Sequence, residues 1–494
     1  MTQTPALRIR EANQAPVRGD AAYVLYWMVA NRRTRSNFAL QRAVEEAKRL
    51  QRPLLVFEPL RCGYPWASDR LHQFVLDGMA DHAEACAEAG VTWLGYVEPE
   101  HGAGRGLLRA LARDAALVVT DEFPTFFIPR MVAAAAEQLS VRVEVVDANG
   151  ILPLREAERA FTVAHAFRRH VHKRVRPHLE TFPEPAPLEG ARALGAASPP
   201  EDAVNRWGLL RRADEVRAID VRALPIDHVV EATSERGGDH AGLTRLRSFI
   251  EHGLPRYHED RNHPDDDASS GLSPFLHFGH IGAHEVVRAA WDREGWTPDR
   301  VAEKPTGKRA GWWNASEALE GFLDEIITWR EVGYGFCYHV PNHDRFASLP
   351  DWAKTTLDAH AADPRPVVYT LEQFRDAQTH DEIWNAAQRQ LVREGRMHNY
   401  LRMLWGKKIL HWSASPQQAL EIMTELNNRF ALDGRDPNSV SGIFWTLGRF
   451  DRAWGPERPV FGKIRYMTSA STRRKLRLKR YLEQHAEHPA QTLF

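Results

Sequence analysis

Residues 22–29 read AYVLYWMV, an uninterrupted apolar run that is typical of a buried strand. Asn37 is a suitable N-cap for a helix that continues to Leu50, and the run PLLVFEP at 53–59 predicts the next strand. The alternation continues, with further helices predicted over 69–89, 105–115 and 128–138, and further strands over 91–98, 116–122 and 141–147. Strands that alternate with helices form right-handed βαβ units. The sequence therefore predicts a Rossmann-like parallel sheet in an N-terminal α/β domain, residues 20–155.

The composition changes after this domain. Residues 156–225, and above all FPEPAPLEGARALGAASPPED at 182–202, are rich in proline, alanine and charge. Such a composition predicts an interdomain connector that is either mobile or wrapped over the surface.

The remainder, residues 226–485, has helical patterns and no convincing strand. The segments Thr379–Glu382 and Ser415–Gln418 resemble capping boxes, and the second has proline at the first helical position. The predicted fold class is therefore α/β plus all-α, with a long connector between an N-terminal sheet domain and a C-terminal helical domain.

The overall composition favours a protein of the bacterial-type cytosol. Apolar residues make up 43% of the chain and charged residues 26%, as in soluble globular proteins. No apolar run approaches the ~20 residues that cross a bilayer. The N-terminal sequence MTQTPALRIREANQAP lacks the basic-then-apolar pattern of a secretion signal. We expect neither a membrane partner nor export.

Metal and disulfide chemistry are not expected. Cys62, Cys86 and Cys337 are far apart, and they form neither a CxxC pair nor the four ligands of an iron–sulfur cluster. The 23 histidines contain no HExxH pattern. The glycine-rich HGAGRG at 101–106 lacks GxGxxG spacing, so it is more typical of a surface turn than of a phosphate loop.

Charge and tryptophan are concentrated in the C-terminal half. The formal net charge is zero, yet residues 449–480 contain eleven Lys and Arg against two acids, Asp451 and Glu457. Eleven of the fifteen tryptophans follow residue 290. Basic side chains interleaved with aromatic ones are typical of nucleic-acid binding.

Six segments of the chain resemble the photolyase/cryptochrome family. GRDPN at 434–438, FGKIRYM at 461–467 and the spacing of the last four segments are similar to class II rather than class I members. With the N-terminal domain, the resemblance covers most of the chain. The segments are GLSPFLHFGHI at 271–281, FLDEIITWRE at 322–331, THDEIWNAAQ at 379–388, GRMHNYLRMLWGKKILHW at 395–412, LNNRFALDGRDPNSVSGIFW at 426–445 and RPVFGKIRYM at 458–467.

This resemblance implies a light-driven enzyme that repairs cyclobutane pyrimidine dimers in UV-damaged DNA, with FAD in the helical domain of residues 226–485. The cofactor would supply the electron that splits the dimer, and the protein would supply position and electrostatics. The resemblance also allows a second, light-gathering antenna chromophore of unknown identity in the N-terminal domain. We expect the enzyme to act as a monomer.

The resemblance also indicates the FAD-binding residues. Arg402 and Asp433 resemble an ion pair beside the flavin, where a guanidinium stabilises a reduced, anionic ring. Asn399 and Asn427 resemble side chains that face the flavin, with Asn427 near its N5 atom. Outside the motifs, such residues are ordinary caps and salt bridges. The residues matched to the phosphates are Tyr257, Ser269, Ser270 and Ser273.

The lesion pocket is implied in the same way. Glu325 matches an active-site carboxylate that bonds to the base carbonyls, a role that a raised pKa in an apolar pocket would suit. Trp329, four residues further on, shares its helix face. Trp329 and Trp445 would stack on an extruded pyrimidine pair, and Met403 would pack against it.

Four basic residues are implied as DNA contacts. Arg452 matches a residue that enters the gap left in the duplex, although FWTLGRFDRAW at 444–454 is shorter than the family pattern and its register is open. Arg261 matches a phosphate-contacting arginine. Lys463 and Arg465 belong to the basic stretch, which predicts salt-sensitive binding.

Three tryptophans resemble the photoreduction triad of class II members. Trp405 and Trp412 are seven residues apart and share a helix face, while Trp384 lies on the preceding helix. Trp405 would be nearest the flavin, Trp384 next and Trp412 outermost. Their ordinary alternative is a structural role in the core.

Three other functions compete with dimer repair. A cryptochrome-like photoreceptor would share the FAD site, but such proteins often have long C-terminal extensions, and this chain stops soon after Arg480. Repair of the (6-4) photoproduct needs a histidine pair that the motifs do not contain. A redox flavoprotein without a DNA role would need neither the aromatic pocket nor the basic stretch.

Overall fold

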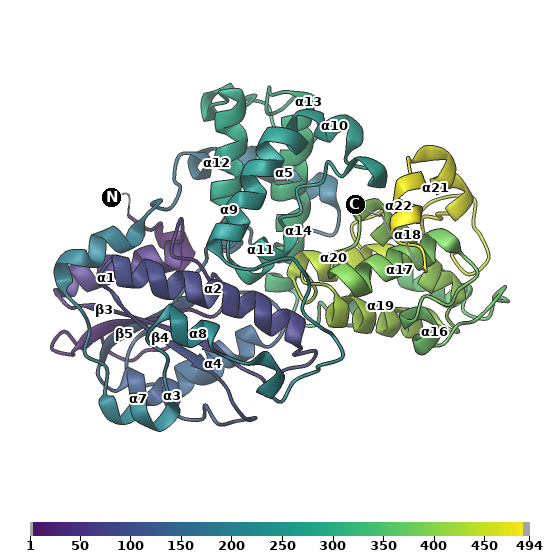
Figure 1. Ribbon diagram of the computed structural model, residues 1–494. Helices are drawn as coiled ribbons and strands as arrows, with labels where there is room; N and C mark the ends of the chain where they lie inside the picture. The colour runs from purple at the N-terminus through teal and green to yellow at the C-terminus, as the bar shows by residue number, and fades with distance from the viewer. Residues whose placement is uncertain (1–2, 488–494) are drawn as a thin grey trace. The chain divides into compact units, whose positions relative to one another are not determined.

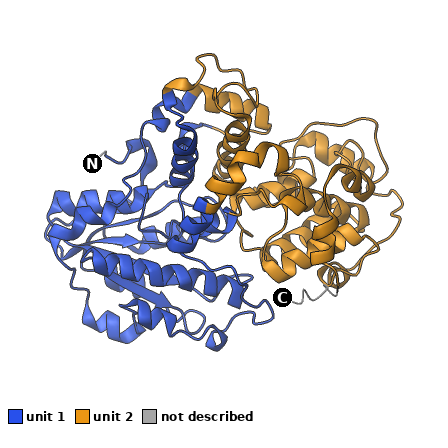
Figure 2. Ribbon diagram, turned by 45° about the horizontal axis from the view of Figure 1, so that its top comes forward, with its two compact units in different colours: residues 1–158, 174–247, 272–298 blue, residues 159–173, 248–271, 299–494 orange. Residues whose placement is uncertain are grey.

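The computed structural model describes residues 3–487. They form two compact units, each built from three separate segments of the chain (Figure 2). Unit 1 comprises residues 1–158, 174–247 and 272–298, and unit 2 comprises residues 159–173, 248–271 and 299–494. The chain therefore passes repeatedly between the units.

Unit 1 contains a six-stranded sheet of order β1-β6-β5-β2-β3-β4. Five strands are parallel, as the alternating pattern predicts, and β1 pairs antiparallel with β6 at one edge. The sequence pattern does not indicate β1, because its three residues lie before the first apolar run. The strands are β1 (Ile9–Glu11), β2 (Tyr23–Trp27), β3 (Leu54–Leu60), β4 (Thr92–Val97), β5 (Ala115–Asp121) and β6 (Val143–Val146).

Helices cover both faces of this sheet. Figure 1 shows α1 and α2 on one face and α3 and α4 on the other, as right-handed crossovers require when the strand order reverses after β4. The predicted N-cap Asn37 accepts hydrogen bonds from the amides of Ala39 and Leu40. The helices are α1 (Phe38–Leu50), α2 (Asp69–Glu88), α3 (Leu107–Ala112), α4 (Ile128–Gln138), α6 (Arg176–Leu179), α7 (Glu201–Trp207), α8 (Ala213–Arg217), α9 (Asp239–Ser248), α11 (Ser273–Phe278) and α12 (Ala283–Glu294).

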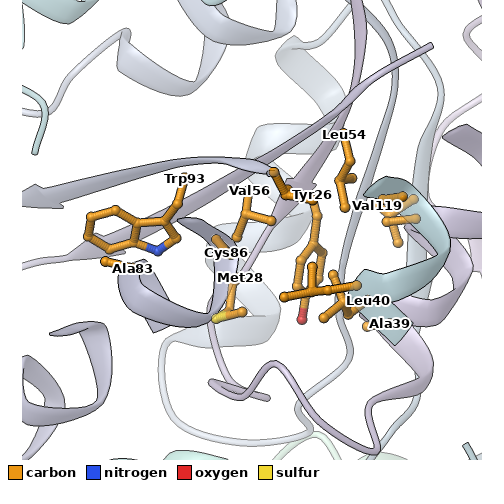
Figure 3. Packing of buried hydrophobic residues seen from close by; sticks show 14 of the residues in the cluster. Tyr26, Met28, Ala39, Leu40, Leu54, Val56, Ala83, Cys86, Trp93 and Val119 are labelled. Atoms are coloured by element: carbon orange, nitrogen blue, oxygen red, sulfur yellow. The ribbon is translucent and has the colours of Figure 1, made fainter. Parts of the chain in front are cut away.

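The unit 1 core lies between the sheet and α1 and α2. Tyr26 and Val56 of the strands, and Met28 directly after β2, pack with Leu40 of α1 and Cys86 of α2 (Figure 3). Each has no more than 1% of its surface exposed. Burying side chains of this size contributes roughly 1.5–3 kcal/mol each before the entropy cost.

The proline-rich connector is wrapped onto unit 1. Leu188 and Ala191 in its 182–202 stretch belong to the core cluster of α1 and α2. Ala213 and Val216 of α8 and Val221 join the same cluster. Of the two states that the composition allows, the described structure has the wrapped one.

A buried ionic cluster crosses unit 1. The His82 ring on α2 contacts Glu58 of β3 through Nδ1 at 2.9 Å and Asp239 of α9 through Nε2 at 3.1 Å. Arg32 and the Trp93 indole also donate to Glu58. Burial opposes a charge on His82, but the carboxylates of Glu58 and Asp239 outweigh it and raise the pKa of His82 to about 10. The charged imidazole and the Arg32 guanidinium thus balance the charges of the two buried carboxylates.

The described part of unit 2 is helical, and all six strands lie in unit 1. Among residues 3–487, no helix combines the length and the hydropathy needed to cross a bilayer. The helices are α5 (Ala164–Arg174), α10 (Tyr257–Asp260), α13 (Glu317–Leu323), α14 (Arg330–His339), α15 (Asp351–Ala359), α16 (Leu371–Arg375), α17 (Glu382–Glu394), α18 (Asn399–Trp412), α19 (Pro416–Phe430), α20 (Pro437–Thr446), α21 (Ser469–Lys475) and α22 (Lys479–Gln484).

Two predicted helix starts differ in detail from the structure. Asp381, not Thr379, caps α17 by accepting from the amide of Trp384, while the Thr379 hydroxyl bonds to Asn385. Ser415 caps α19 as predicted, but the Gln418 side chain accepts from the amide of Ala414 rather than completing the box. A capping box is therefore absent at both places, although each helix begins within two residues of the prediction.

Candidate functional site

Three indoles form a continuous row inside unit 2. Trp384 of α17 lies between Trp405 and Trp412 of α18, with ring centroids 6.4 and 6.2 Å away. Its ring is nearly parallel to Trp405, at 5°, and inclined by 67° to Trp412. The three residues expose at most 2% of their surface. The structure thus brings together the residues matched to the electron-transfer triad, with Trp384 in the middle.

Hydrogen bonds fix two of these rings. Trp384 Nε1 donates to the carbonyl of Trp405 at 3.1 Å, and Trp405 Nε1 donates to Gln388 Oε1 at 2.8 Å. At the other end, the Lys408 ammonium lies 4.9 Å from the Trp412 ring centroid. A row with satisfied N–H groups has little freedom to change its spacing.

The start of α18 is a polar site. Arg402 donates two hydrogen bonds to Asp433, at 3.0 and 2.9 Å, in the expected pairing. No side chain caps the helix among the described residues. Burial lowers the pKa of His398 to about 4, and its buried Nδ1 has no hydrogen-bond partner within residues 3–487. Uncapped helix amides and a fixed guanidinium favour an anionic ligand.

The two asparagines occupy different environments. Asn399 is exposed at the first position of α18. Asn427 is buried in α19, and its amide donates to Asn428 Oδ1 at 3.1 Å and Ser439 Oγ at 2.8 Å. These bonds use the amide nitrogen, so the carbonyl oxygen of Asn427 is the atom left for a ligand.

The residues matched to the phosphates divide between the units. Tyr257 is buried at the start of α10, and Ser269 and Ser270 are half-buried in the loop that ends unit 2's second segment. Ser269 donates to Asp267. Ser273 begins the six-residue helix α11 and is exposed in unit 1. The structure groups the first three in one unit and assigns Ser273 to the other.

Glu325 and Trp329 lie on a π-helical segment, Asp324–Trp329, inserted between α13 and α14. Both are half-buried, whereas the residues between them are buried, so the two share one accessible face. π-helical insertions are frequent at functional sites because they redirect side chains. The motif alone does not reveal this local widening.

Glu325 is charge-paired rather than set in an apolar pocket. Arg261 Nη1 donates to Glu325 Oε1 at 2.6 Å, and its guanidinium lies 5.3 Å from the Tyr257 ring centroid. Burial and the Glu325 charge raise the pKa of Tyr257 to about 12. Arg261, matched to a DNA phosphate, is thus directed to Glu325 in this structure. Sequence spacing could not predict the pair, because the two residues are 64 positions apart.

Cations and indoles alternate around Trp445, which lies near the end of α20. Lys407 lies 4.8 Å and Arg465 5.5 Å from its ring centroid. Arg465 also lies 4.1 Å from the Trp454 ring, which Arg452 approaches at 4.7 Å. These five residues, Lys407, Trp445, Arg465, Trp454 and Arg452, are called the cation–aromatic row below.

Asp451 organises the outer part of this row. It accepts two hydrogen bonds from Arg465, at 2.9 and 3.2 Å, and one from Trp454 Nε1 at 3.1 Å. The family resemblance indicates Trp445, Arg465 and Arg452 but neither Lys407 nor Trp454. A lysine pair, Lys407 and Lys408, between the apolar residues of α18 was the available sign. Met403 is half-buried on the same helix.

Part of the basic stretch is neutralised within unit 2. Arg477 pairs with Asp260 and Asp266, both at 2.6 Å, and Arg473 pairs with Glu382 at 2.6 Å. Lys463 contacts Glu457 at 3.3 Å. The excess of Lys and Arg along the sequence therefore overstates the positive charge in space.

In unit 1, two carboxylates accept hydrogen bonds from backbone amides that could otherwise bind an anion. Asp121, at the end of β5, accepts from the amides of Val29, Ala30 and Asn31, which follow β2. Glu98 accepts from Gly102 in the HGAGRG loop at 3.1 Å, which agrees with a surface turn. Carboxylates thus hold amides that an open α/β sheet could offer to phosphate.

An aromatic group lies beside the carboxyl ends of β3 and β5. Trp66 and Phe126 stack with centroids 6.1 Å apart, and both have positive φ, 65° and 62°. Tyr64 stacks on Phe127, whose ring also faces the Arg61 guanidinium. Side chains in left-handed backbone are costly, so their surroundings must hold them.

Comparisons with known proteins agree with this geometry. The sequence profile of the DNA photolyase family matches residues 24–187. Deoxyribodipyrimidine photo-lyase of Methanothermobacter thermautotrophicus is 34% identical over 482 residues, which cover 97% of this chain and 98% of the relative. The enzyme of the same name from Potorous tridactylus is also 34% identical, over 91% of this chain and 79% of its own.

A solved structure has the same fold. The crystal structure of a bacterial class III photolyase from Agrobacterium tumefaciens superposes with a TM-score of 0.64, over 87% of this chain and 80% of that chain. Sequence identity is 19%, so the likeness concerns the fold: an N-terminal parallel sheet followed by a helical region.

Proposed function

Because the chain belongs to the DNA photolyase family, we propose that it repairs cyclobutane pyrimidine dimers in UV-damaged DNA under light. The row of Trp405, Trp384 and Trp412 carries the proposal, because three buried indoles with ring centroids 6.4 and 6.2 Å apart suit electron transfer. A cryptochrome-like photoreceptor is not favoured, since the curated relatives described above are named photo-lyases. We propose a monomer that acts in the cytosol.

FAD is the cofactor that these residues fit. An anionic, hydrogen-bonding ring system suits three features of this site. They are the uncapped start of α18, the His398 Nδ1 atom, which has no hydrogen-bond partner within residues 3–487, and the Arg402–Asp433 pair. Bound and reduced, FAD would supply the photoexcited electron for dimer splitting. Arg402 would balance its negative charge and Asn427 would offer its amide. Tyr257, Ser269 and Ser270 of unit 2 would contact the phosphates, and Asn399 would face the flavin.

The protein's own residues would then perform three tasks. Trp412, Trp384 and Trp405 would conduct an electron inward along their row. Trp329, Met403 and Trp445 would line the pocket and exclude water from a flipped dimer. Glu325, oriented by Arg261, would hydrogen-bond to, or share a proton with, the base carbonyls as the dimer gains an electron.

DNA would bind through the basic side chains of unit 2. Arg452, at the exposed end of the cation–aromatic row, would enter the space left by the flipped dimer. Arg465 and Lys463 would approach the backbone phosphates. Phosphate contacts supply most of the sequence-independent affinity, so binding should weaken with salt.

We further propose membership of class II. The strings GRDPN at 434–438 and FGKIRYM at 461–467 support it, as does the placement of the three indoles on α17 and α18. The likeness to a class III structure, at 19% identity, concerns the fold alone.

The functional division that we propose has a second chromophore on residues 20–155, a connector at 156–225, and FAD and DNA sites on 226–485. The aromatic group of Tyr64, Trp66, Phe126 and Phe127 supports a planar chromophore at the carboxyl edge of the sheet. The amides after β2 are already bound by Asp121, so we expect this chromophore to be held by stacking rather than by that loop.

Dimer repair itself is the decisive experiment. Protein with reduced FAD is mixed with an oligonucleotide that carries one thymine cyclobutane dimer, in darkness and under blue light. Recovery of thymine absorbance only in the light supports the proposal. No recovery with FAD bound and reduced would favour a photoreceptor, and salt-independent DNA binding would favour a redox flavoprotein.

A matched pair of variants tests the role of Glu325. We expect Glu325→Gln to slow repair by about 10²-fold with FAD still bound, because a positioned acid–base group contributes at least that much. Glu317→Gln, on the preceding helix and with 80% of its side chain exposed, is the control and should repair normally. Equal rates for the two variants would remove Glu325 from the chemistry.

A further inference from the structure

Lys407 is a fully buried lysine of α18, the helix that also contains Trp405 and Trp412. It exposes 0% of its surface, and its Nζ donates to the carbonyl of Thr446 at 2.6 Å. Thr446 is the last residue of α20, so the ammonium group lies at the negative end of that helix. The same Nζ lies 4.8 Å from the ring centroid of Trp445, the preceding residue.

An ammonium group in this position is expensive for the fold. Removing it from water costs several kcal/mol, and an apolar side chain of similar length would avoid that cost. Burial lowers the pKa of Lys407 to about 7; the nearby Asp451 carboxylate opposes this shift and the Arg465 guanidinium adds to it. These two charged groups pair with each other, and the Arg465 guanidinium lies 5.5 Å from the Trp445 ring centroid. Within residues 3–487, the hydrogen bond of the Lys407 ammonium goes to the Thr446 carbonyl and not to Asp451.

The contacts of Lys407 converge on one side chain. Its hydrogen bond fixes the end of α20, and its charge attracts the Trp445 ring face, an interaction that strengthens when water is excluded. Arg465 lies 5.5 Å from the centroid of the same ring, so two cations contact Trp445. Lys407, which is fully buried, is the cation of the two that is fixed within the helical core.

We propose that Lys407 is a positioning residue that holds the Trp445 indole in place as one wall of the lesion pocket. This inference rests on the proposed function of Trp445 and adds a dependence on charge. The protonated lysine makes both the hydrogen bond and the cation–π contact, whereas the neutral amine loses the second. The contact is therefore present below about pH 7 and is lost as the pH rises through that value.

The first test measures dissociation constants for DNA with and without one thymine dimer. Lys407→Met is expected to weaken binding of damaged DNA about tenfold, as loss of a desolvated cation–π contact predicts. Binding of undamaged DNA and flavin photoreduction should not change. Lys354→Met, a half-exposed lysine of α15, is the charge-matched control and should bind as the parent does.

A double-variant cycle separates positioning from general stability. In a Trp445→Phe background, Lys407→Met should have little further effect on damaged-DNA affinity. If the two losses simply add, Lys407 acts elsewhere and the proposal fails.

A second readout needs neither DNA nor repair. The difference in tryptophan fluorescence between the parent and Trp445→Phe is followed as the pH rises through 7. We expect a titration in the parent that is absent from Lys407→Arg, which keeps its charge. No titration in the parent overturns the proposal, even if Lys407→Met does not fold. A titration without repair activity would instead contradict the proposed function and leave the Lys407–Trp445 contact supported.

Discussion

Trp384 contacts both other indoles of the tryptophan row: its ring is parallel to that of Trp405 and steeply inclined to that of Trp412. Replacing Trp405 removes the first contact, and replacing Trp412 removes the second. The inner link also carries a hydrogen bond from the Trp384 indole to the Trp405 carbonyl. Chemistry at the flavin and delivery of electrons to it are therefore separable at the level of single residues.

We expect Trp405→Phe to abolish photoreduction of bound FAD while repair by chemically reduced enzyme persists at nearly the parental rate. Phenylalanine keeps the packing but is much harder to oxidise than tryptophan. Flavin absorbance during illumination gives the first quantity, and dimer repair gives the second. Trp296→Phe, a buried indole of unit 1, is the control. Normal photoreduction in Trp405→Phe would show that the row is only structural.

His82 is predicted to contribute most to stability when it is charged. His82→Gln should lower the free energy of unfolding by roughly 3–5 kcal/mol, because it removes the cation beside buried Asp239 and leaves Glu58 with Arg32 alone. The folded pKa is raised to about 10, so this contribution is complete below the unfolded pKa of about 6.5 and is lost as the pH rises through 10.

Urea unfolding at neutral and high pH measures this effect, with hydrogen exchange of the β3 amides as a readout specific to unit 1. His240→Gln is the control, because 78% of that side chain is exposed. A His82 variant as stable as this control at neutral pH would mean that the cluster is neutral in the folded protein.

At the scale of elements, the sequence predicted each parallel strand to within two or three residues at its ends. Apolar runs bounded by polar turns specify buried strands directly, so this success has a local cause. The edge strand β1 was missed because three residues carry no period. Thr379 was taken for a cap that Asp381 supplies, since both residues are good N-caps and only the backbone decides between them.

The residue pairs of the site also fall into those that a local sequence pattern predicts and those that it does not. Trp405 and Trp412 share α18, so their proximity follows from the helix period. Arg261 and Glu325 come from α10's end and a π-helical segment, and no local pattern joins them. The burial of Lys407 depends on α20 packing over α18, which is a tertiary property. Long-range pairs between charged residues, such as Arg261 with Glu325, therefore follow from no local pattern, and Arg402–Asp433 was expected only because its segments resemble the family.

The Ser415 cap of α19 supports the helix that carries Asn427. We expect Ser415→Ala to destabilise the start of α19 by about 1 kcal/mol, because the Gln418 amide loses its acceptor. Faster hydrogen exchange of that amide is the measurement. Ser415→Asp, which keeps an acceptor, should exchange at nearly the parental rate. Equal acceleration in both variants would show that the hydroxyl does not cap the helix.

At the scale of the whole molecule, net charge and local charge give different expectations. The chain is neutral overall, yet residues 449–480 are basic, and some of these cations are already paired within unit 2. A cation that is held by two carboxylates has little to offer a phosphate. Salt dependence of DNA binding distinguishes the two groups.

We expect Arg474→Ala to reduce the slope of log K against log salt by about 1, as loss of one phosphate contact predicts. Arg474 is exposed and makes no ion pair within residues 3–487. Arg477→Ala should leave the slope unchanged, because Asp260 and Asp266 hold that side chain. Fluorescence anisotropy over a series of salt concentrations measures both. Equal changes would mean that Arg477 exchanges its acids for DNA.

The interleaved segments of the two units also govern how the protein is made. All six strands have been synthesised by residue 146, but Asp239, which neutralises His82, and the last segment of unit 1, 272–298, follow much later. At roughly 5–20 residues per second, a ribosome needs on the order of ten seconds to supply them. During that interval the nascent sheet has a buried histidine without one of its carboxylates and an uncovered edge of its core. The N-terminal sheet therefore cannot mature first and alone, and a truncation between residues 158 and 298 would release an incomplete unit 1.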